Sequence, residues 1–253
     1  MLKFIGTGSA FNNEMGNTAA FIKEDDTLLL IDCGETVFSR IKEVNLLDDV
    51  KNVYIIITHN HDDHIGSLGS LIAYLNEIKG IIPNIVITNS EESETQEKSL
   101  RDYLTSVGIA EESYEFVYGD MMEDVLTDLV KIEEIKVKHS KILTSYAIEL
   151  HFKNRVIYYT GDHNDPSYLK KIAKKLKKDD IIYTDCSLRD YPKRIHILLD
   201  ELKEIFEEKQ RDQVVCMHFE NYNAYSEAKR EGFKVANKEL SKEEILKSIA
   251  NRK

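Results

Sequence analysis

The sequence predicts an α/β layered fold made of one large domain, and two observations lead to this prediction. Apolar, β-branched runs that are typical of strands alternate with segments of helical periodicity along the chain. No linker rich in Pro, Gly or Ser separates these elements, and the 253 residues include 3 prolines. We therefore expect residues 1–253 to form a single domain, since one core can serve a chain of this length.

The expected elements follow one another in a regular order. The first strand starts almost at residue 1, in an apolar run without a secretory signal. Asn154 predicts a tight hairpin between two later strands. The lysine-rich segment 170–178 carries apolar residues at helical spacing, so its lysines form either the solvated face of an amphipathic helix or a phosphate-binding patch. The predicted strands are 2–5, 18–23, 27–31, 53–57, 84–88, 114–117, 131–138, 145–152, 155–160, 181–184, 213–217 and 233–236. The predicted helices are 36–43, 66–78, 93–107, 166–177, 195–209, 224–231 and 241–250.

The loop after the predicted strand 53–57 has the pattern His-x-His-x-Asp-His, formed by His59, His61, Asp63 and His64. Three of the 8 histidines fall within six positions, which scattered histidines in a polar loop would rarely show. Imidazole nitrogens and carboxylate oxygens suit zinc, manganese or iron(II). His59 and His61 alternate and can face one metal, whereas Asp63 and His64 lie further round the turn and can face a second.

Three later strands are each followed by a further candidate ligand, namely His139, Asp162 and His218. Ligand-bearing loops at strand ends are how open α/β folds build their sites. The total of seven candidate ligands is enough for two divalent cations about 3.5–4 Å apart. Cys216 is an alternative ligand, but the set is complete without it.

In this pattern the chain resembles the metallo-β-lactamase superfamily, and within it the phosphodiesterase branch typified by ribonuclease Z. The opening Gly-Thr-Gly-Ser-Ala at 6–10, the Ile-Asp-Cys-Gly segment at 31–34, the histidine-rich loop and Thr-Gly-Asp at 160–162 occur in the family's order. The resemblance implies a four-layer αββα sandwich of two similar halves. It also implies two divalent metal ions, Zn²⁺ first and Mn²⁺ as the alternative. By position, one metal lies on His59, His61 and His139, and the other lies on Asp63, His64 and His218, with Asp162 as the bridge.

The resemblance also suggests catalytic residues. Asp63 is expected to serve catalysis as well as metal binding. His196 matches the position of the family's extra catalytic histidine, although the surrounding residues differ from its usual His-Ser-Thr form. This histidine could donate a proton to the leaving group or hold the phosphate, and the alternative is a helix-start residue that packs or caps. We expect Asp32 to order the metal loop by hydrogen bonds, and His163 to lie outside the ligand set.

Charge and spacing bear on the substrate. The net charge of −11 works against binding a polyanion such as tRNA. Only 23 positions separate His139 from Asp162, so the tRNA-clamping arm that ribonuclease Z carries there is absent. Among arm-less relatives, the chain resembles the anti-Pycsar enzymes of phages and some bacteria. This resemblance implies hydrolysis of 3′,5′-cyclic nucleotides (such as cCMP, cUMP, cAMP and cGMP) to nucleoside 5′-monophosphates, counteracting Pycsar anti-phage signalling.

Other functions stay open from the sequence. They are a tRNA 3′-processing endonuclease, another hydrolase of the same fold, and a non-catalytic metal-binding protein, which the complete ligand set disfavours. We expect no membrane span, because no run of 18 apolar residues exists, and no nucleic-acid partner. Three widely spaced cysteines indicate reduced thiols and a cytoplasmic location. The resemblance further implies a homodimer, with segment 89–125 reaching the partner; alternatively, the apolar residues of this segment cover their own core.

Overall fold

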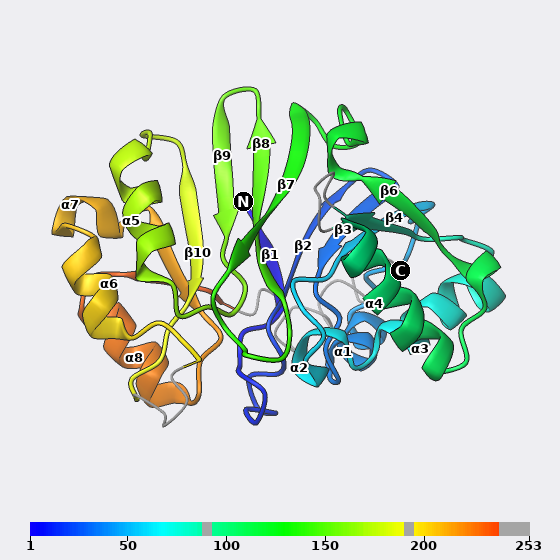
Figure 1. Ribbon diagram of the computed structural model, residues 1–253, viewed down its shortest axis with the longest axis horizontal. Helices are drawn as coiled ribbons and strands as arrows, with labels where there is room; N and C mark the ends of the chain where they lie inside the picture. Colours follow the sequence, from blue (N-terminus) through cyan, green and yellow to red (C-terminus); the bar gives the residue numbers. More distant parts are fainter. Residues whose placement is uncertain (88–92, 190–194, 238–253) are drawn as a thin grey trace, which may run out of the picture.

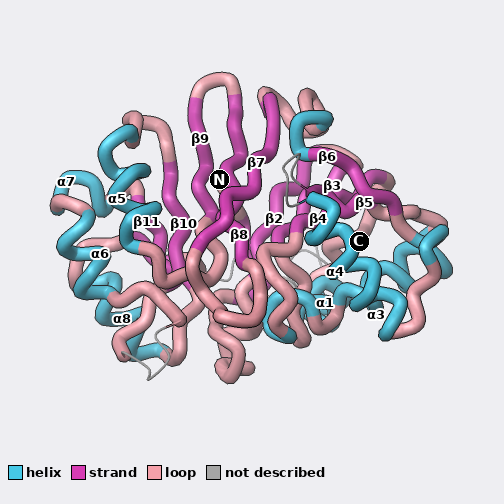
Figure 2. The backbone as a smooth tube through the Cα atoms, in the orientation of Figure 1, coloured by secondary structure: helices cyan, strands magenta, loops and turns pink. Residues whose placement is uncertain are grey.

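The computed structural model describes residues 1–87, 93–189 and 195–237, which form two facing six-stranded sheets with helices on their outer sides (Figures 1 and 2). The first sheet has its strands in sequential order: β1 (Lys3–Gly6), β2 (Ala19–Glu24), β3 (Thr27–Ile31), β4 (Asn52–Ile56), β5 (Asn84–Ile87) and β6 (Glu115–Tyr118). The second sheet consists of β7 (Leu129–Val137), β8 (Ser145–Phe152), β9 (Arg155–Tyr159), β10 (Ile181–Asp185), β11 (Val214–Met217) and β12 (Lys234–Val235).

The two sheets share one topology. In each, the first three strands pair antiparallel and the strands from the third onward pair parallel. The helices are α1 (Val37–Glu43), α2 (Asp62–Ile65), α3 (Leu68–Tyr74), α4 (Ser93–Ser106), α5 (Pro166–Lys175), α6 (Leu199–Ile205), α7 (Glu208–Arg211) and α8 (Tyr222–Arg230). This repeat confirms the expected sandwich of two similar halves.

Four layers have three interfaces, and a separate apolar cluster fills each of them. Successive side chains of a strand point to opposite faces of its sheet, so a strand that is buried on both faces is apolar throughout. On β3, Leu28 and Leu30 pack in the cluster with α1, α3 and α4, whereas Leu29 and Ile31 pack in the cluster between the sheets. The third cluster joins β10 and β11 to α5, α6 and α8. The middle cluster holds the two halves together. Both halves therefore contribute loops to the same edge of the sandwich.

Two predicted helices have different bounds in the structure. The segment predicted as helix 66–78 is α3 followed by a π-helical turn over Leu75–Lys79. The segment predicted as helix 195–209 is not helical at first, because Ser187 and Leu198 form a β-bridge, and it is then divided into α6 and α7. His196 therefore lies in a bend before the helix, not at its start. The predicted helix 241–250 lies outside the described residues.

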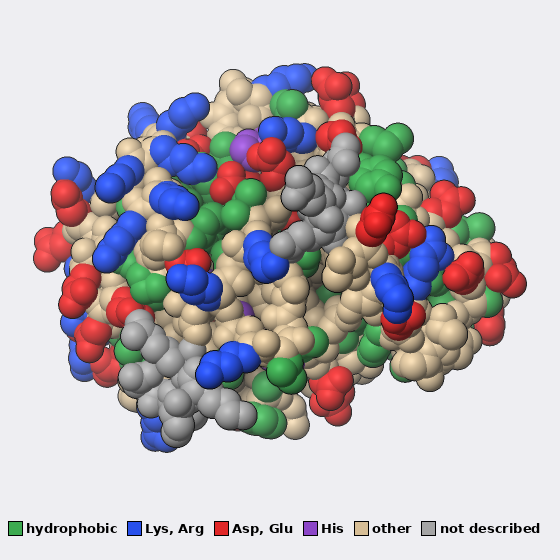
Figure 3. All heavy atoms as spheres, viewed as in Figure 1, with side chains coloured by type: hydrophobic (Ala, Val, Ile, Leu, Met, Phe, Trp, Pro, Cys, Tyr) green, Lys and Arg blue, Asp and Glu red, His purple; other side chains and the backbone are tan. Residues whose placement is uncertain are grey.

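The lysine-rich helix α5 is amphipathic, as the spacing indicates. Tyr168, Leu169 and Ile172 are buried, while the lysines of the helix are exposed. Figure 3 shows lysine and arginine side chains gathered over this part of the surface, toward the left of the view. Among the described residues, no helix is both long and apolar enough to cross a membrane.

Segment 89–125 mostly covers its own core where it is described. Leu100, Leu104, Tyr114 and Met122 are buried, so the alternative interpretation of the segment holds for these residues. Met121 is 69% exposed and is, with Val107 and Tyr118, an exposed apolar side chain of the described part of this segment that could contact another chain.

We expect the protein to be a homodimer whose interface includes Met121. Light scattering should then give twice the chain mass of 29.2 kDa. Met121→Glu should shift the protein toward monomer, because a charge placed in an apolar contact must be desolvated. Ile78→Glu, at an apolar side chain that is 67% exposed outside this segment, is the control and should leave the mass unchanged. A monomeric mass for the fully active wild-type protein would contradict the expectation.

Candidate metal centre

Asp32 anchors the loop that follows β4. Its carboxylate is fully buried and accepts hydrogen bonds from the backbone N–H of Thr58 at 2.8 Å and the Thr58 hydroxyl at 3.0 Å. It also lies 2.8 Å from Nδ1 of His64. A proton on that nitrogen leaves Nε2 of His64 as a lone-pair donor. The expectation that Asp32 orders the metal loop is confirmed. Gly34 lets the two segments pack, because a Cβ there would overlap the carbonyl oxygen of Asp63.

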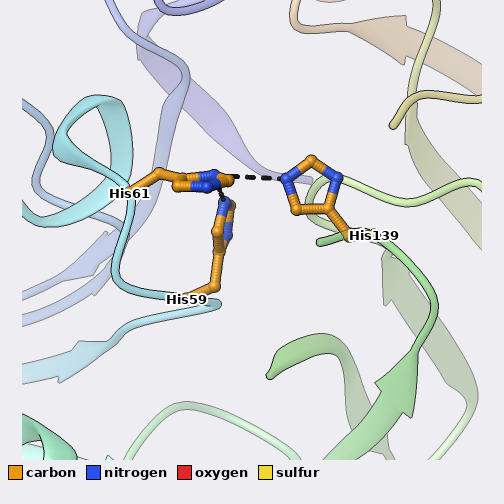
Figure 4. A group of neighbouring side chains, drawn as sticks. All are labelled: His59, His61 and His139. Carbon is orange, nitrogen blue, oxygen red and sulfur yellow. Dashed lines mark hydrogen bonds between the residues drawn. The ribbon is translucent and has the colours of Figure 1, made fainter. Parts of the chain in front are cut away.

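Three imidazoles converge in the first group of candidate ligands (Figure 4). Nδ1 of His61 lies 2.8 Å from Nε2 of His59 and 3.2 Å from Nε2 of His139. Nδ1 of His139 donates to the carbonyl oxygen of Ile195 at 2.6 Å, which directs Nε2 into the group. Burial lowers the pKa of all three imidazoles, so they are neutral at pH 7. Neutral imidazoles whose nitrogens face one another are suited to share a cation.

The second group consists of Asp63, His64, Asp162 and His218. Oδ2 of Asp63 lies 3.4 Å from Nε2 of His64 and 3.2 Å from Nε2 of His218. Two atoms of this group, Nε2 of His64 and Oδ1 of Asp162, are buried without a hydrogen-bond partner. Buried polar atoms are rarely left unpaired, so the group fits a cation that would satisfy them.

Asp162 faces both groups through its two oxygens. Oδ1 lies 3.3 Å from Nε2 of His64 and 3.3 Å from Nε2 of His218, whereas Oδ2 lies 3.9 Å from Nε2 of His139. Burial alone raises the pKa of this carboxyl, but His218 and His64 outweigh it and hold the pKa well below its usual range. The carboxylate is therefore ionised and placed to bridge two cations.

All seven predicted ligands thus lie in two adjacent groups, and Asp162 of the second group also lies close to His139 of the first and to His196. The parallel strands β4, β9 and β11 end at the same edge of the sandwich, and His139 reaches it from β7. Nitrogen and carboxylate donors of this kind fit divalent metal ions. We propose the distribution that the resemblance implies, with Asp162 shared by both metals.

His196 lies at the rim of the two groups, held by a residue that the sequence analysis missed. Asp185, at the end of β10, is fully buried, and its Oδ2 lies 2.9 Å from Nδ1 of His196. Burial opposes the charged imidazolium, but the hydrogen bond to Asp185 and the charges of Asp162 and Asp185 raise the pKa of His196 to about 9. With Nδ1 bound to Asp185, Nε2 carries the proton that the site can donate. Its position at the end of an apolar strand is a weak signal, because no motif spacing links Asp185 to another residue of the site.

His163 takes part in the same network without joining the ligand groups. Its Nε2 lies 3.3 Å from Oδ1 of Asp185 and 3.1 Å from the Thr184 hydroxyl. The side chain is fully buried. Among the described residues, Oδ1 of Asp185 has no hydrogen-bond partner, whereas Oδ2 accepts from the backbone N–H of His163 at 3.3 Å and faces His196.

Comparison with known proteins agrees with this geometry. Residues 1–240 match the family model for anti-Pycsar protein Apyc1. The protein of that name from Bacillus phage 010DV004 is 27% identical over 238 residues, which span 86% of this chain and 88% of the relative. The metallo-β-lactamase fold protein YhfI from Bacillus subtilis has a TM-score of 0.68 at 16% identity, covering 93% of this chain and 94% of YhfI. The short form of human tRNase Z has a TM-score of 0.61 at 18% identity, covering 93% and 95%. The fold is therefore the αββα metallo-β-lactamase sandwich.

Proposed function

This chain belongs to the anti-Pycsar protein Apyc1 family, and from that membership we propose that it is a metal-dependent phosphodiesterase that hydrolyses 3′,5′-cyclic nucleotides to nucleoside 5′-monophosphates. The observation that supports this most is the position of Asp162, whose two oxygens face two separate groups of metal donors. The biological role that we propose is removal of the nucleotide signal of Pycsar defence, with the cytoplasm as the place of action.

The residues divide into two roles. When bound, two divalent cations supply an activated water and neutralise charge on the phosphoryl oxygens. We propose Zn²⁺ as the natural metal, with Mn²⁺ as the alternative. His59, His61 and His139 hold one ion, and the group around Asp63 and His64 holds the other. Hydrolysis of the ring expels the ribose 3′ oxygen, which must gain a proton. His196 supplies that proton from Nε2, and Asp185 keeps its ring in the required orientation.

The lack of a cationic binding arm favours a small substrate. Between His139 and Asp162 the chain forms the hairpin of β8 and β9 and no further helix or strand. The protein carries a net charge of −11, which repels a long polyanion. A cyclic nucleotide carries a single negative charge, so two cations hold it without a large basic surface.

Turnover of a substrate panel tests the proposal. Purified protein loaded with Zn²⁺ or Mn²⁺ is given cCMP, cUMP, cAMP, cGMP, a precursor tRNA, bis(p-nitrophenyl) phosphate and a lactone. We expect cyclic nucleotides to be converted to 5′-monophosphates. Efficient cleavage of the precursor tRNA, with every cyclic nucleotide untouched, would instead assign the tRNA 3′-processing activity. Turnover of the lactone alone would assign another hydrolase of this fold.

Asp185→Asn tests the positioning of His196. The amide can turn its NH₂ group toward Nδ1 and no longer favours the imidazolium, so we expect turnover of cyclic nucleotides to fall about 10²-fold. Bis(p-nitrophenyl) phosphate, whose leaving group needs no proton, should lose less. Metal content should be unchanged, since Asp185 is not among the seven ligands. Asp180→Asn is the control, because this buried carboxylate near the start of β10 binds backbone N–H groups away from the site. Equal losses on both substrates would remove Asp185 from this role.

A further inference from the structure

A cavity of about 200 Å³ opens beside the first metal group. His59 belongs to both, because it lines the cavity and its Nε2 faces His61. The walls come from the metal loop, from α4 and from the segment that leads into β8, including Asn60, Leu100, Leu143 and Tyr146. Whole ligand sites usually measure about 300–1,000 Å³, so this cavity suits a single ring system and not a complete nucleotide.

Gln96 is, with Thr58 and His59, one of the buried polar residues that line this cavity, and it is 7% exposed. Its amide nitrogen Nε2 donates to Oε1 of Glu134 on β7 at 2.9 Å. A carboxylate can only accept, so Glu134 fixes the orientation of the Gln96 amide. The carbonyl oxygen Oε1 of Gln96 is left buried without a hydrogen-bond partner. A buried acceptor in this state costs free energy unless a ligand donates to it.

Two further polar residues that line the cavity already have partners, and one of them is Thr58, whose hydroxyl donates to Asp32 at 3.0 Å. Nδ2 of Asn60 donates to the hydroxyl of Ser99 at 2.8 Å. The Gln96 carbonyl is thus the cavity's fixed acceptor, between the apolar side chains of Leu100 and Tyr146. An apolar slot with one oriented acceptor is complementary to a flat ring that presents a donor on its edge.

Resting on the proposed function, we propose that this cavity receives the nucleobase of the cyclic nucleotide and that Gln96 selects bases with an amino group at C4 of a pyrimidine or C6 of a purine. Cytosine and adenine present such an amino group, whereas uracil and guanine present a carbonyl oxygen at the corresponding position. That oxygen would face the Gln96 carbonyl and leave both acceptors unpaired. The phosphate lies at the metals while the base lies beyond His59.

The first test compares bases within each ring size. For the wild-type protein we expect kcat/KM to be about tenfold higher for cCMP than for cUMP, and for cAMP than for cGMP. Gln96→Met keeps the length of the side chain but removes the acceptor, and it should abolish this preference. Bis(p-nitrophenyl) phosphate carries no base, so its turnover should change much less than that of cCMP. A preference that survives Gln96→Met would overturn the inference.

A second variant tests the orientation without removing Gln96. Glu134→Gln offers an amide partner that can accept or donate, so the Gln96 amide can turn and present its NH₂ group. The preference for amino-bearing bases should then weaken or reverse toward cUMP and cGMP. Glu149→Gln is the matched control, since Glu149 is also buried in the second sheet but contacts Tyr168 and Lys175 outside the cavity.

Binding provides a readout that does not depend on turnover. Calorimetry should show that 5′-CMP binds to the wild-type protein more tightly than 5′-UMP does. The two nucleotides should bind to Gln96→Met with equal affinity. The outcomes separate the two proposals. If the wild-type protein hydrolyses no cyclic nucleotide, the proposed function fails. If it hydrolyses all four equally and the variants behave alike, only the assignment of Gln96 fails.

Discussion

Asp162→Ala should remove both metal ions and nearly all activity. Metal analysis of wild-type protein purified without chelator should approach two equivalents of divalent ion per chain. Asp162 is the carboxylate whose oxygens face both donor groups, at 3.3 Å from His64 and 3.9 Å from His139. Removal of this carboxylate therefore weakens metal binding in both groups and not in a single one. Two cations supply several kcal/mol of transition-state stabilisation, so we expect turnover to fall about 10³-fold or more.

The loss of metal binding in Asp162→Ala should also be visible in the thermal stability of the protein. Metal binds the folded site and not the unfolded chain, so the wild-type protein should melt at a higher temperature with metal than after chelation. This difference in melting temperature between the metal-bound and the chelated protein should be much smaller for Asp162→Ala. Asp165→Ala is the control from the same loop, because Asp165 caps α5 by accepting from Ser167 and Tyr168. It should cost about 1 kcal/mol of stability and leave the metal content intact. One full equivalent of metal retained by Asp162→Ala would contradict the shared bridge.

His196→Ala should reduce hydrolysis of cyclic nucleotides by about 10²–10⁴-fold while the metal content stays the same. The ribose 3′ oxygen is a poor leaving group without a proton, and Nε2 of His196 is the donor that Asp185 orients. A p-nitrophenyl ester has a leaving group that needs no proton, so the reduction of turnover should be much smaller for this substrate. His151→Ala provides the control, because His151 pairs with Glu133 and Glu149 away from the metal groups. Equal losses on both substrates would assign His196 to phosphate positioning.

The same role of His196 predicts the direction of the pH dependence. An imidazolium donates its proton only below its pKa, so turnover of cyclic nucleotides should fall as the pH rises through that pKa. The hydrogen bond to Asp185 and the charge of Asp162 raise the pKa of His196 to about 9. Cations on Asp162 oppose part of that effect, so the descending limb should lie at or below about pH 9. It should be absent from the profile of His196→Ala.

The sequence alone was sufficient to predict the fold and to find the seven candidate ligands. Buried strands are apolar throughout, and each of the ligand-bearing strands ends abruptly in His or Asp. Because the two sheets of this sandwich end their parallel strands at one edge, His59 after β4 and His218 after β11 could be expected together despite their distance in the sequence. This inference needs only strand ends, which local patterns mark well.

Only the tertiary structure decided which polar side chains support that centre. Asp185 was missed because a lone aspartate after a strand has no spacing signal, and its role depends on facing His196 across 11 positions. The segment around His196 is not helical because Leu198, two residues further on, forms a β-bridge with Ser187, which overrides the local helical pattern. The link between Gln96 and Glu134 joins a helix to a strand of the opposite half. Such contacts depend on how the layers pack. Helix and strand periodicities fix which face of an element is buried, but not which other element packs against that face.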